Sequence, residues 1–161
     1  MKIRKVKHNN RKKAFEVDTY RNSYLFPYAK LEIAPSKENP IQCVAVDCEL
    51  ANEAFTYTLE SGEEGTVHMD HVLEYNRDPQ YLRDQLLYKL TLAAQDGVKH
   101  SSLSKRELIR RLGTSPAQFY RLLDQTNYKK SLDKLLSLLH VLDCEVDLIV
   151  NNKLQQTRKA V

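Results

Sequence analysis

The segment SKRELIRRLGTSPAQFYRLLDQ, residues 104–125, contains side chains whose types and spacing could recognise the edges of nucleic-acid bases. Near the start of a helix, the amide group of Gln118 can make two hydrogen bonds to an adenine, and Arg121 one turn later can reach a guanine or a phosphate. The compact side chains of Pro116 and Ala117 would let such a helix approach the bases closely. We therefore predict that DNA bases are read by Pro116, Ala117, Gln118 and Arg121.

The same part of the chain has an excess of positive charge, which suits contact with a phosphate backbone. Residues 99–134 carry nine Lys and Arg but three Asp and Glu. If about five to six phosphates are neutralised per subunit, affinity should fall steeply with salt, since the log–log slope is about −0.9 per contact. The side chains expected to hold phosphates are those of Lys105, Arg106, Thr114, Ser115, Lys129 and Lys130. The alternative is a solvated basic surface on an ordinary pair of helices.

Two cysteines and two histidines, Cys43, Cys48, His68 and His71, have the right types for a zinc site, with the spacing C-x4-C-x19-H-x2-H. The two residues of each pair point to opposite faces of an ideal strand, so tetrahedral ligation would need a bulge or turn in each pair. The interpretation that we favour is buried cysteines that pack as small apolar side chains, with histidines along a strand. We therefore expect neither a metal nor another cofactor.

No arrangement of side chains for catalysis stands out. No cysteine has an arranged partner nearby, and the four glycines are scattered rather than gathered in a phosphate-binding loop. Aromatic residues between positions 20 and 28 could form a contact surface for a partner, but we favour their packing in the core of a small sheet. These aromatic residues are Tyr20, Tyr24, Phe26 and Tyr28. We expect a binding protein and not an enzyme.

Local capping signals indicate where the helices that would position these side chains begin. Asp78 can cap a helix that starts at Pro79 and continues through regularly spaced leucines to Gly97. Ser131 can cap a leucine-rich helix that extends to Leu142. In both helices the apolar residues recur every three to four positions, which is typical of an amphipathic helix.

Two shorter helices between these two are separated by a turn that contains a glycine. Ser104 is followed three residues later by Glu107, and Ser115 by Gln118, which is the pattern of a capping box in each case. Gly113 can adopt the positive φ that ends the first helix. Two short helices joined in this way are typical of a helix-turn-helix, whose second helix enters the major groove of DNA.

Residues 14–74 show the alternation of apolar and polar residues that is typical of β-strands. The run SGEEG, residues 61–65, is a good hairpin turn, and no internal repeat is evident. A further alternating run, CEVDLIV at residues 144–150, predicts a short C-terminal strand. The strand-like runs are AFEVDTY, IQCVAVDCEL, EAFTYTLES and GTVHMDHVL, which begin at residues 14, 41, 53 and 65.

Charge is distributed unevenly along the chain. Residues 1–13 carry seven Lys and Arg and no acid, residues 14–80 have a net charge of −9, and residues 81–161 one of +6. We interpret residues 1–13 as a basic arm, which is either a solvated tail, as we favour, or a segment that lies in the minor groove.

No run approaches the about 18–20 apolar residues of a membrane helix. Three cysteines without a disulfide framework favour the cytoplasm.

The stretch LSKRELIRRLGTSPAQFYRLLDQTNYKKSLDKLLSLLHVLDCEV resembles the phage-repressor type of helix-turn-helix, the XRE family. The resemblance covers residues 80–145 and includes Glu107-Leu108, Leu112-Gly113, Ser115 and Leu132–Leu142. It implies a bundle of four or five helices that binds duplex DNA as a homodimer, with the family's reading positions on residues 116, 117, 118 and 121. The whole chain also resembles small bacterial proteins that place a β-rich domain before this module, and antitoxins of toxin–antitoxin pairs.

The predicted fold is α+β, with a small N-terminal antiparallel β domain, a four- to five-helix repressor-like domain and a short C-terminal strand. The predicted parts are a basic arm (residues 1–13), an acidic β-rich domain (14–76), a helix-turn-helix domain (77–150) and a tail (151–161). We expect a sequence-specific, duplex-DNA-binding transcriptional regulator that acts as a homodimer. The alternative is an antitoxin or other protein-interaction module, whose acidic β domain would bind a basic partner such as a toxin. A third and weaker alternative is a metal sensor.

Overall fold

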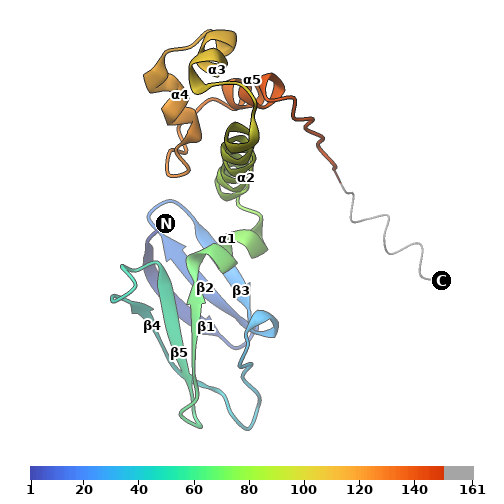
Figure 1. The fold of residues 1–161 in the computed structure, drawn as a ribbon. Helices are drawn as coiled ribbons and strands as arrows, with labels where there is room; N and C mark the ends of the chain where they lie inside the picture. The colour runs from blue at the N-terminus through green and yellow to red at the C-terminus, as the bar shows by residue number, and fades with distance from the viewer. Residues whose placement is uncertain (151–161) are drawn as a thin grey trace, which may run out of the picture. The chain divides into compact units, whose positions relative to one another are not determined.

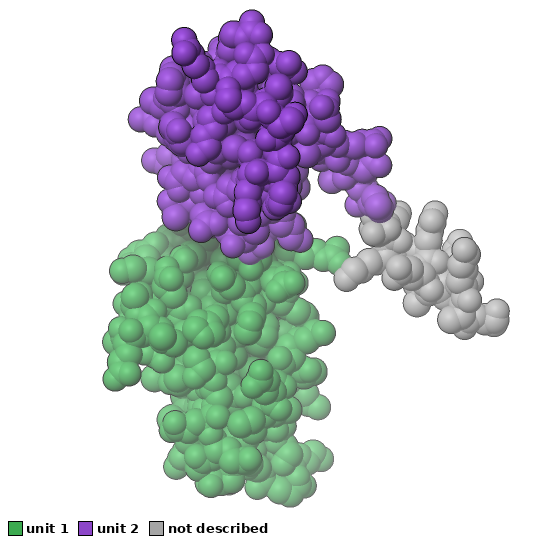
Figure 2. Space-filling view, viewed as in Figure 1, with its two compact units in different colours: residues 1–83 green, residues 84–161 purple. Residues whose placement is uncertain are grey.

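The computed structural model describes residues 1–150 and shows an α+β protein, in which two three-stranded antiparallel sheets precede five α-helices (Figure 1). The chain divides into two units, Met1–Arg83 and Asp84–Val161, and the described residues of each surround a hydrophobic core of their own (Figure 2). The predicted order, a β domain followed by a helical domain, is confirmed.

The strands of the first unit form two sheets of the same order. In one sheet the strands follow the order β1-β2-β3 and in the other β4-β5-β6, and all neighbouring strands are antiparallel. The six strands are β1 (Ile3–Asn9), β2 (Ala14–Thr19), β3 (Ser23–Pro27), β4 (Ile41–Asp47), β5 (Ala54–Leu59) and β6 (Glu64–His68). Three of the predicted runs contain β2, β4 and β5, and the predicted hairpin turn joins β5 to β6.

Both sheets are built on one plan. The central strands β2 and β5 each start with Ala-Phe, and the same alternating positions of both are buried. In each sheet the pairing of the first two strands contains one irregularity, between Ile3 and Lys5 in β1 and between Ile41 and Cys43 in β4. The third strand of each sheet leads directly into a helical turn.

Equivalent hydrogen bonds hold the ends of these strands. The side-chain oxygen of Asn9 accepts two bonds, both of 3.1 Å, from backbone N–H groups of the following turn, and Oδ1 of Asp47 does the same at 2.9 and 3.0 Å. The N–H that opens each helical turn donates to the carbonyl just before the central strand, at 2.9 Å from Tyr28 and 2.8 Å from Met69. The helical turns are η1 (Tyr28–Lys30), a short 3-10 helix, and α1 (Met69–Asn76). The first unit therefore repeats one β-β-β-helix plan, which the sequence did not reveal because the two halves share few residues.

Residues 1–13 are not an arm, contrary to our expectation, but contribute β1 to the first sheet. Ile3 and Val6 are buried, and the irregularity after Ile3 brings both to the inner face although they are three residues apart. The irregularity also hides the period-two pattern of a strand. With β1 included, residues 1–83 carry twelve Lys and Arg and thirteen Asp and Glu, so the net charge of the first unit is −1 and the unit is not acidic.

Aromatic side chains lie at the centre of the first core. The ring of Phe15 contacts the rings of Tyr28 and Phe55 edge to face, at centroid distances of 5.1 and 4.8 Å. The preferred interpretation, core packing of the aromatic segment, is confirmed for Tyr24, Phe26 and Tyr28, whereas Tyr20 is exposed.

The fourth predicted strand is shorter than expected, since β6 ends at His68 and α1 begins at the next residue. Met69, Val72 and Leu73 are buried, and their spacing of three and four residues is that of a helix face. In a segment of only eight residues, this spacing of apolar residues also resembles the alternation of a strand that is interrupted once, so the sequence could not distinguish a helix from a strand here. Neither α1 nor β3 was predicted.

The remaining helices begin where the capping signals placed them. Oδ1 of Asp78 accepts a bond of 3.0 Å from the N–H of Tyr81, and its Oδ2 accepts one of 2.9 Å from the hydroxyl of Tyr24. The hydroxyls of the three predicted serine caps each accept a bond from the N–H three residues later. The helices are α2 (Pro79–His100), α3 (Lys105–Leu112), α4 (Pro116–Leu123) and α5 (Leu132–Val141).

Gly97 does not end α2, as the sequence led us to expect, because the helix continues to His100. A Cβ atom at this position would lie 3.1 Å from Cδ1 of Leu142 and 3.6 Å from Sγ of Cys144. The glycine therefore makes room for the segment that follows α5 and has a packing role.

Residues 144–150 do not form the predicted C-terminal strand. The side chains of Leu148, Ile149 and Val150 are 79%, 80% and 83% exposed. The part of the second unit that the structure describes contains no strand, so this alternating run has nothing in its own unit with which to pair. The predicted tail, residues 151–161, lies outside the described residues.

Candidate nucleic-acid interface

The corner between α3 and α4 is built by a three-residue turn over a shared core. Gly113 has a φ of 61°, as predicted, and its N–H donates to the carbonyl of Arg110 at 3.1 Å, while Thr114 donates to Ile109 at 3.2 Å. Beneath the turn, Leu108 and Phe119 are completely buried. The turn and the core together fix the direction in which α4 leaves the corner.

The outer face of α4 presents the four predicted reading residues. Pro116, Ala117, Gln118 and Arg121 are all exposed, while the opposite face of the helix is buried. Among residues 1–150, no hydrogen bond or ion pair engages the side chain of Gln118 or that of Arg121. The structure thus brings these residues together on one accessible surface with their polar groups free.

Tyr120 also lies on this surface, and the sequence interpretation missed it. Its side chain is 54% exposed, and the ammonium group of Lys105 lies 5.9 Å from the centroid of its ring. The residue follows Pro116 by four positions, so the helical period already places the two side by side. An exposed aromatic ring here can contact a thymine methyl group or, through its hydroxyl, a phosphate.

The first three residues of α4 offer one free backbone donor. Pro116 has no N–H, and the N–H of Gln118 is bonded to Oγ of Ser115 at 3.3 Å, which leaves the N–H of Ala117 for an anion. Ser115 is exposed and Thr114 half-buried, so both hydroxyls of the predicted phosphate site lie at the surface of the turn. The anion site at this helix start therefore has fewer N–H donors than a helix without proline would provide.

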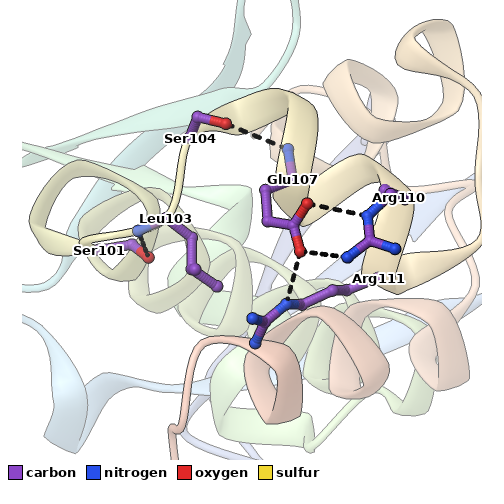
Figure 3. A network of polar contacts seen from close by, with 6 residues as sticks. All are labelled: Ser101, Leu103, Ser104, Glu107, Arg110 and Arg111. Carbon is purple, nitrogen blue, oxygen red and sulfur yellow. Dashed lines mark hydrogen bonds and ion pairs between the residues drawn. The ribbon is translucent and has the colours of Figure 1, made fainter.

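A carboxylate on α3 pairs with both arginines at the end of that helix (Figure 3). Nη2 and Nε of Arg110 lie 2.6 and 2.8 Å from the carboxylate oxygens of Glu107, and Nε of Arg111 lies 3.0 Å away. The hydrogen bonds from Arg110 and Arg111 lower the pKa of Glu107 to about 2. Lys105 and Arg106, both exposed, are therefore the cations of α3 that no carboxylate pairs within residues 1–150.

The two predicted phosphate-binding lysines after α4 lie in opposite environments. Lys129 is exposed, but Lys130 is buried, with only 7% of its surface accessible. Nζ of Lys130 donates to Oγ1 of Thr91 at 2.7 Å and to the carbonyls of Leu122 and Asp124 at 3.0 and 2.5 Å. Burial lowers the pKa of Lys130. The prediction for Lys130 is wrong, because all three of its N–H donors are used inside the unit.

At the far end of α4, Asp124 places a negative charge on the surface. Its carboxylate accepts bonds of 2.7 and 2.9 Å from the hydroxyl and the N–H of Thr126. These bonds lower the pKa of Asp124, so the carboxylate is ionised at neutral pH. A phosphate would therefore be repelled from the end of the helix and not from its start.

The four candidate zinc ligands do not come together. Residues 1–150 contain no group of three or more His, Cys, Asp and Glu that could hold a metal ion. Cys43 and Cys48 are exposed, contrary to our expectation that they are buried. His68 ends β6 and His71 lies in α1, with their rings 6.3 Å apart.

No helix in the described part of the chain is long and apolar enough to cross a membrane. Comparisons of the chain with protein-family models, with curated proteins and with solved structures found no match. The chemistry of the surface around α4 is therefore inferred from its own residues.

Proposed function

We propose that the protein is a sequence-specific DNA-binding transcriptional regulator, with α4 as the helix that enters the major groove. The observation that carries this proposal is the outer face of α4, where Gln118 in the first turn and Arg121 in the last turn are both exposed and unpaired. Such a face on the second helix of a helix-turn-helix is suited to base edges.

Each side chain on this face has a distinct role in the proposal. Gln118 makes paired hydrogen bonds to an adenine, and Arg121 contacts a guanine or a nearby phosphate. The methyl group of Ala117 and the ring of Pro116 lie against the bases, where apolar atoms favour a thymine methyl. The ring of Tyr120 lies beside these residues, at the edge of the proposed base contact that is next to Lys105 of α3.

The phosphates on either side of the groove are held by groups that are free at the surface. These are Lys105 and Arg106 on α3, Ser115 with the N–H of Ala117 at the turn, and Lys129 after α4. The half-buried Thr114 borders them. Asp124 keeps phosphates away from the end of α4, which favours docking by its first half.

The decisive measurement is a duplex-binding titration after selection of a preferred site from random DNA. Gln118→Ala and Arg121→Ala should each lower affinity for the selected site about tenfold or more, the worth of one good base contact. Gln42→Ala, which removes an exposed glutamine of β4, serves as the matched control and should change nothing. Unchanged affinity and unchanged base preference in both α4 variants would remove the assignment.

The proposed regulator acts as a homodimer, so the selected DNA itself can report on the assembly. A two-fold symmetric dimer reads two inverted half-sites about 34 Å apart, one turn of the duplex. Selected sequences with a single half-site would contradict the dimer and leave base reading by α4 intact. The toxin-binding alternative is not favoured by charge, because the first unit has a net charge of −1.

A further inference from the structure

The C-terminal end of α4 is held by side chains at four successive backbone carbonyls. Nδ2 of Asn127 donates to Arg121 at 3.3 Å, and Nε2 of Gln95 donates to Leu123 at 2.7 Å. The carbonyls of Leu122 and Asp124 accept from Nζ of Lys130, at 3.0 and 2.5 Å. Side chains of the second unit thus bond all four carbonyls from residue 121 to residue 124, and the backbone N–H of Asn127 also donates to the carbonyl of Asp124, at 3.2 Å.

The backbone at this end explains why side chains are needed. Helices commonly end in a left-handed residue, usually glycine, whose following N–H groups satisfy the last carbonyls. α4 instead ends at Asp124 with φ −78° and ψ 108°, an extended conformation in which that closure is impossible. Side-chain donors therefore take the place of the backbone at the carbonyls of Arg121, Leu122 and Leu123.

Lys130 connects this helix end to α2. Its third bond goes to Oγ1 of Thr91, which in turn donates to the carbonyl of Leu87 at 2.6 Å. Gln95, which holds Leu123, lies one turn further along the same helix. The positive charge also faces the negative end of the α4 dipole, where a cation is stabilised. Two side chains thus fasten α4 to the longest helix of the described chain.

We propose that Lys130, assisted by Gln95, is a positioning residue that fixes the orientation in which α4 meets DNA. This inference rests on the proposed function. With eight residues α4 behaves as one rigid rod, so a tilt at its end displaces Ala117 and Gln118 at its start. Base contacts tolerate errors of only about 0.5 Å, and a loosened helix end therefore costs base recognition although every side chain that contacts DNA is still present.

Two adjacent lysines make a matched pair for the test, because Lys129 is exposed and Lys130 is not. In the full-length protein, Lys130→Met and Lys129→Met are compared with the wild type in titrations of the selected duplex and of an unrelated duplex, across a salt series. All titrations are done at a temperature where circular dichroism shows each protein fully folded. A side chain that only stabilises the fold then leaves affinity unchanged.

Lys130→Met should lower affinity for the selected duplex about tenfold, the worth of one good base contact, and leave the unrelated duplex and the salt slope unchanged. Lys129→Met should lower the salt slope by about 0.9 and weaken both duplexes alike, as loss of a phosphate contact requires. Gln95→Met should reproduce the Lys130→Met pattern more weakly, and it replaces that variant if Lys130→Met does not fold.

The outcomes separate the two proposals. A wild-type protein that binds no duplex removes the proposed function, and the positioning role with it. A wild type that binds, with Lys130→Met equal to it on both duplexes, overturns the positioning role alone. A fall in the salt slope for Lys130→Met like that for Lys129→Met would make Lys130 a phosphate ligand, which also overturns the inference.

Discussion

At the scale of single residues, Gly65 shows how one missing atom shapes the first core. It lies opposite Tyr57 in the pairing of β5 with β6, and the ring of Tyr57 occupies the space that a Cβ atom would need. That ring cannot easily move, because it is buried and its hydroxyl donates to the carbonyl of Ile33 at 2.9 Å.

Gly65→Ala should therefore lower the free energy of unfolding of the first unit by about 1–3 kcal/mol, the usual cost of overpacking. Thr66→Ser, at the exposed neighbouring position, should change the same quantity by about 0.5 kcal/mol or less. Urea unfolding followed by circular dichroism measures both. Equal stability of the two variants would show that Tyr57 has room to shift.

The residues of the candidate site show what a sequence can and cannot reveal at this scale. The exposure of Ala117, Gln118 and Arg121 follows from the helical period once the buried positions of α4 are known. The burial of Lys130 does not, since it depends on Thr91, which is 39 residues away in the chain. Two adjacent lysines thus have opposite environments, and only the tertiary structure distinguishes them.

At the scale of elements, the quality of prediction depended on whether the signal was local. Each helix of the second unit carries its own cap within three residues, so its start could be found from the sequence. The predicted end of α2 was wrong because Gly97 makes room for Leu142, which is distant in the sequence, and is not a local signal that ends the helix. β1 was missed because a register irregularity breaks its alternation, and only pairing with β2 shows that it is a strand.

The identity of β1 as a strand can be tested by charge substitution on its two faces. Val6→Asp places a carboxylate in the core and should destabilise the first unit by about 3 kcal/mol or more, enough to unfold many small domains. Lys7→Asp lies on the outer face and should cost about 1 kcal/mol or less, mostly through the neighbouring Glu16. Thermal unfolding distinguishes these results. Equal melting temperatures of the two variants would contradict β1 and favour the interpretation of residues 1–13 as a solvated tail.

At the scale of the whole molecule, the chain contains two hydrophobic cores that share no residue. One is formed by the sheets with α1, and the other by α2 to α5. The fold class could be predicted because strand-like and helix-like periods are separated along the sequence. The boundary could not, because it falls inside the continuous helix α2, where neither composition nor capping changes.

Separate cores should make the two units respond separately to damage. Leu59→Ala and Leu135→Ala each remove a fully buried leucine, from the first and the second core respectively, and each should cost about 2–5 kcal/mol. Hydrogen exchange of the full chain, read by mass spectrometry, reports the local opening of each region.

Leu59→Ala should accelerate amide exchange in β1 to β6 and leave α3 to α5 at the wild-type rate, whereas Leu135→Ala should do the reverse. Because the residues that read DNA in our proposal all lie in the second unit, only Leu135→Ala should also weaken duplex binding. Exchange that accelerates equally in both units after either substitution would show that the two cores unfold as one. In that case a change in the stability of the first unit would also alter the proposed DNA-binding surface, and no ligand would be required.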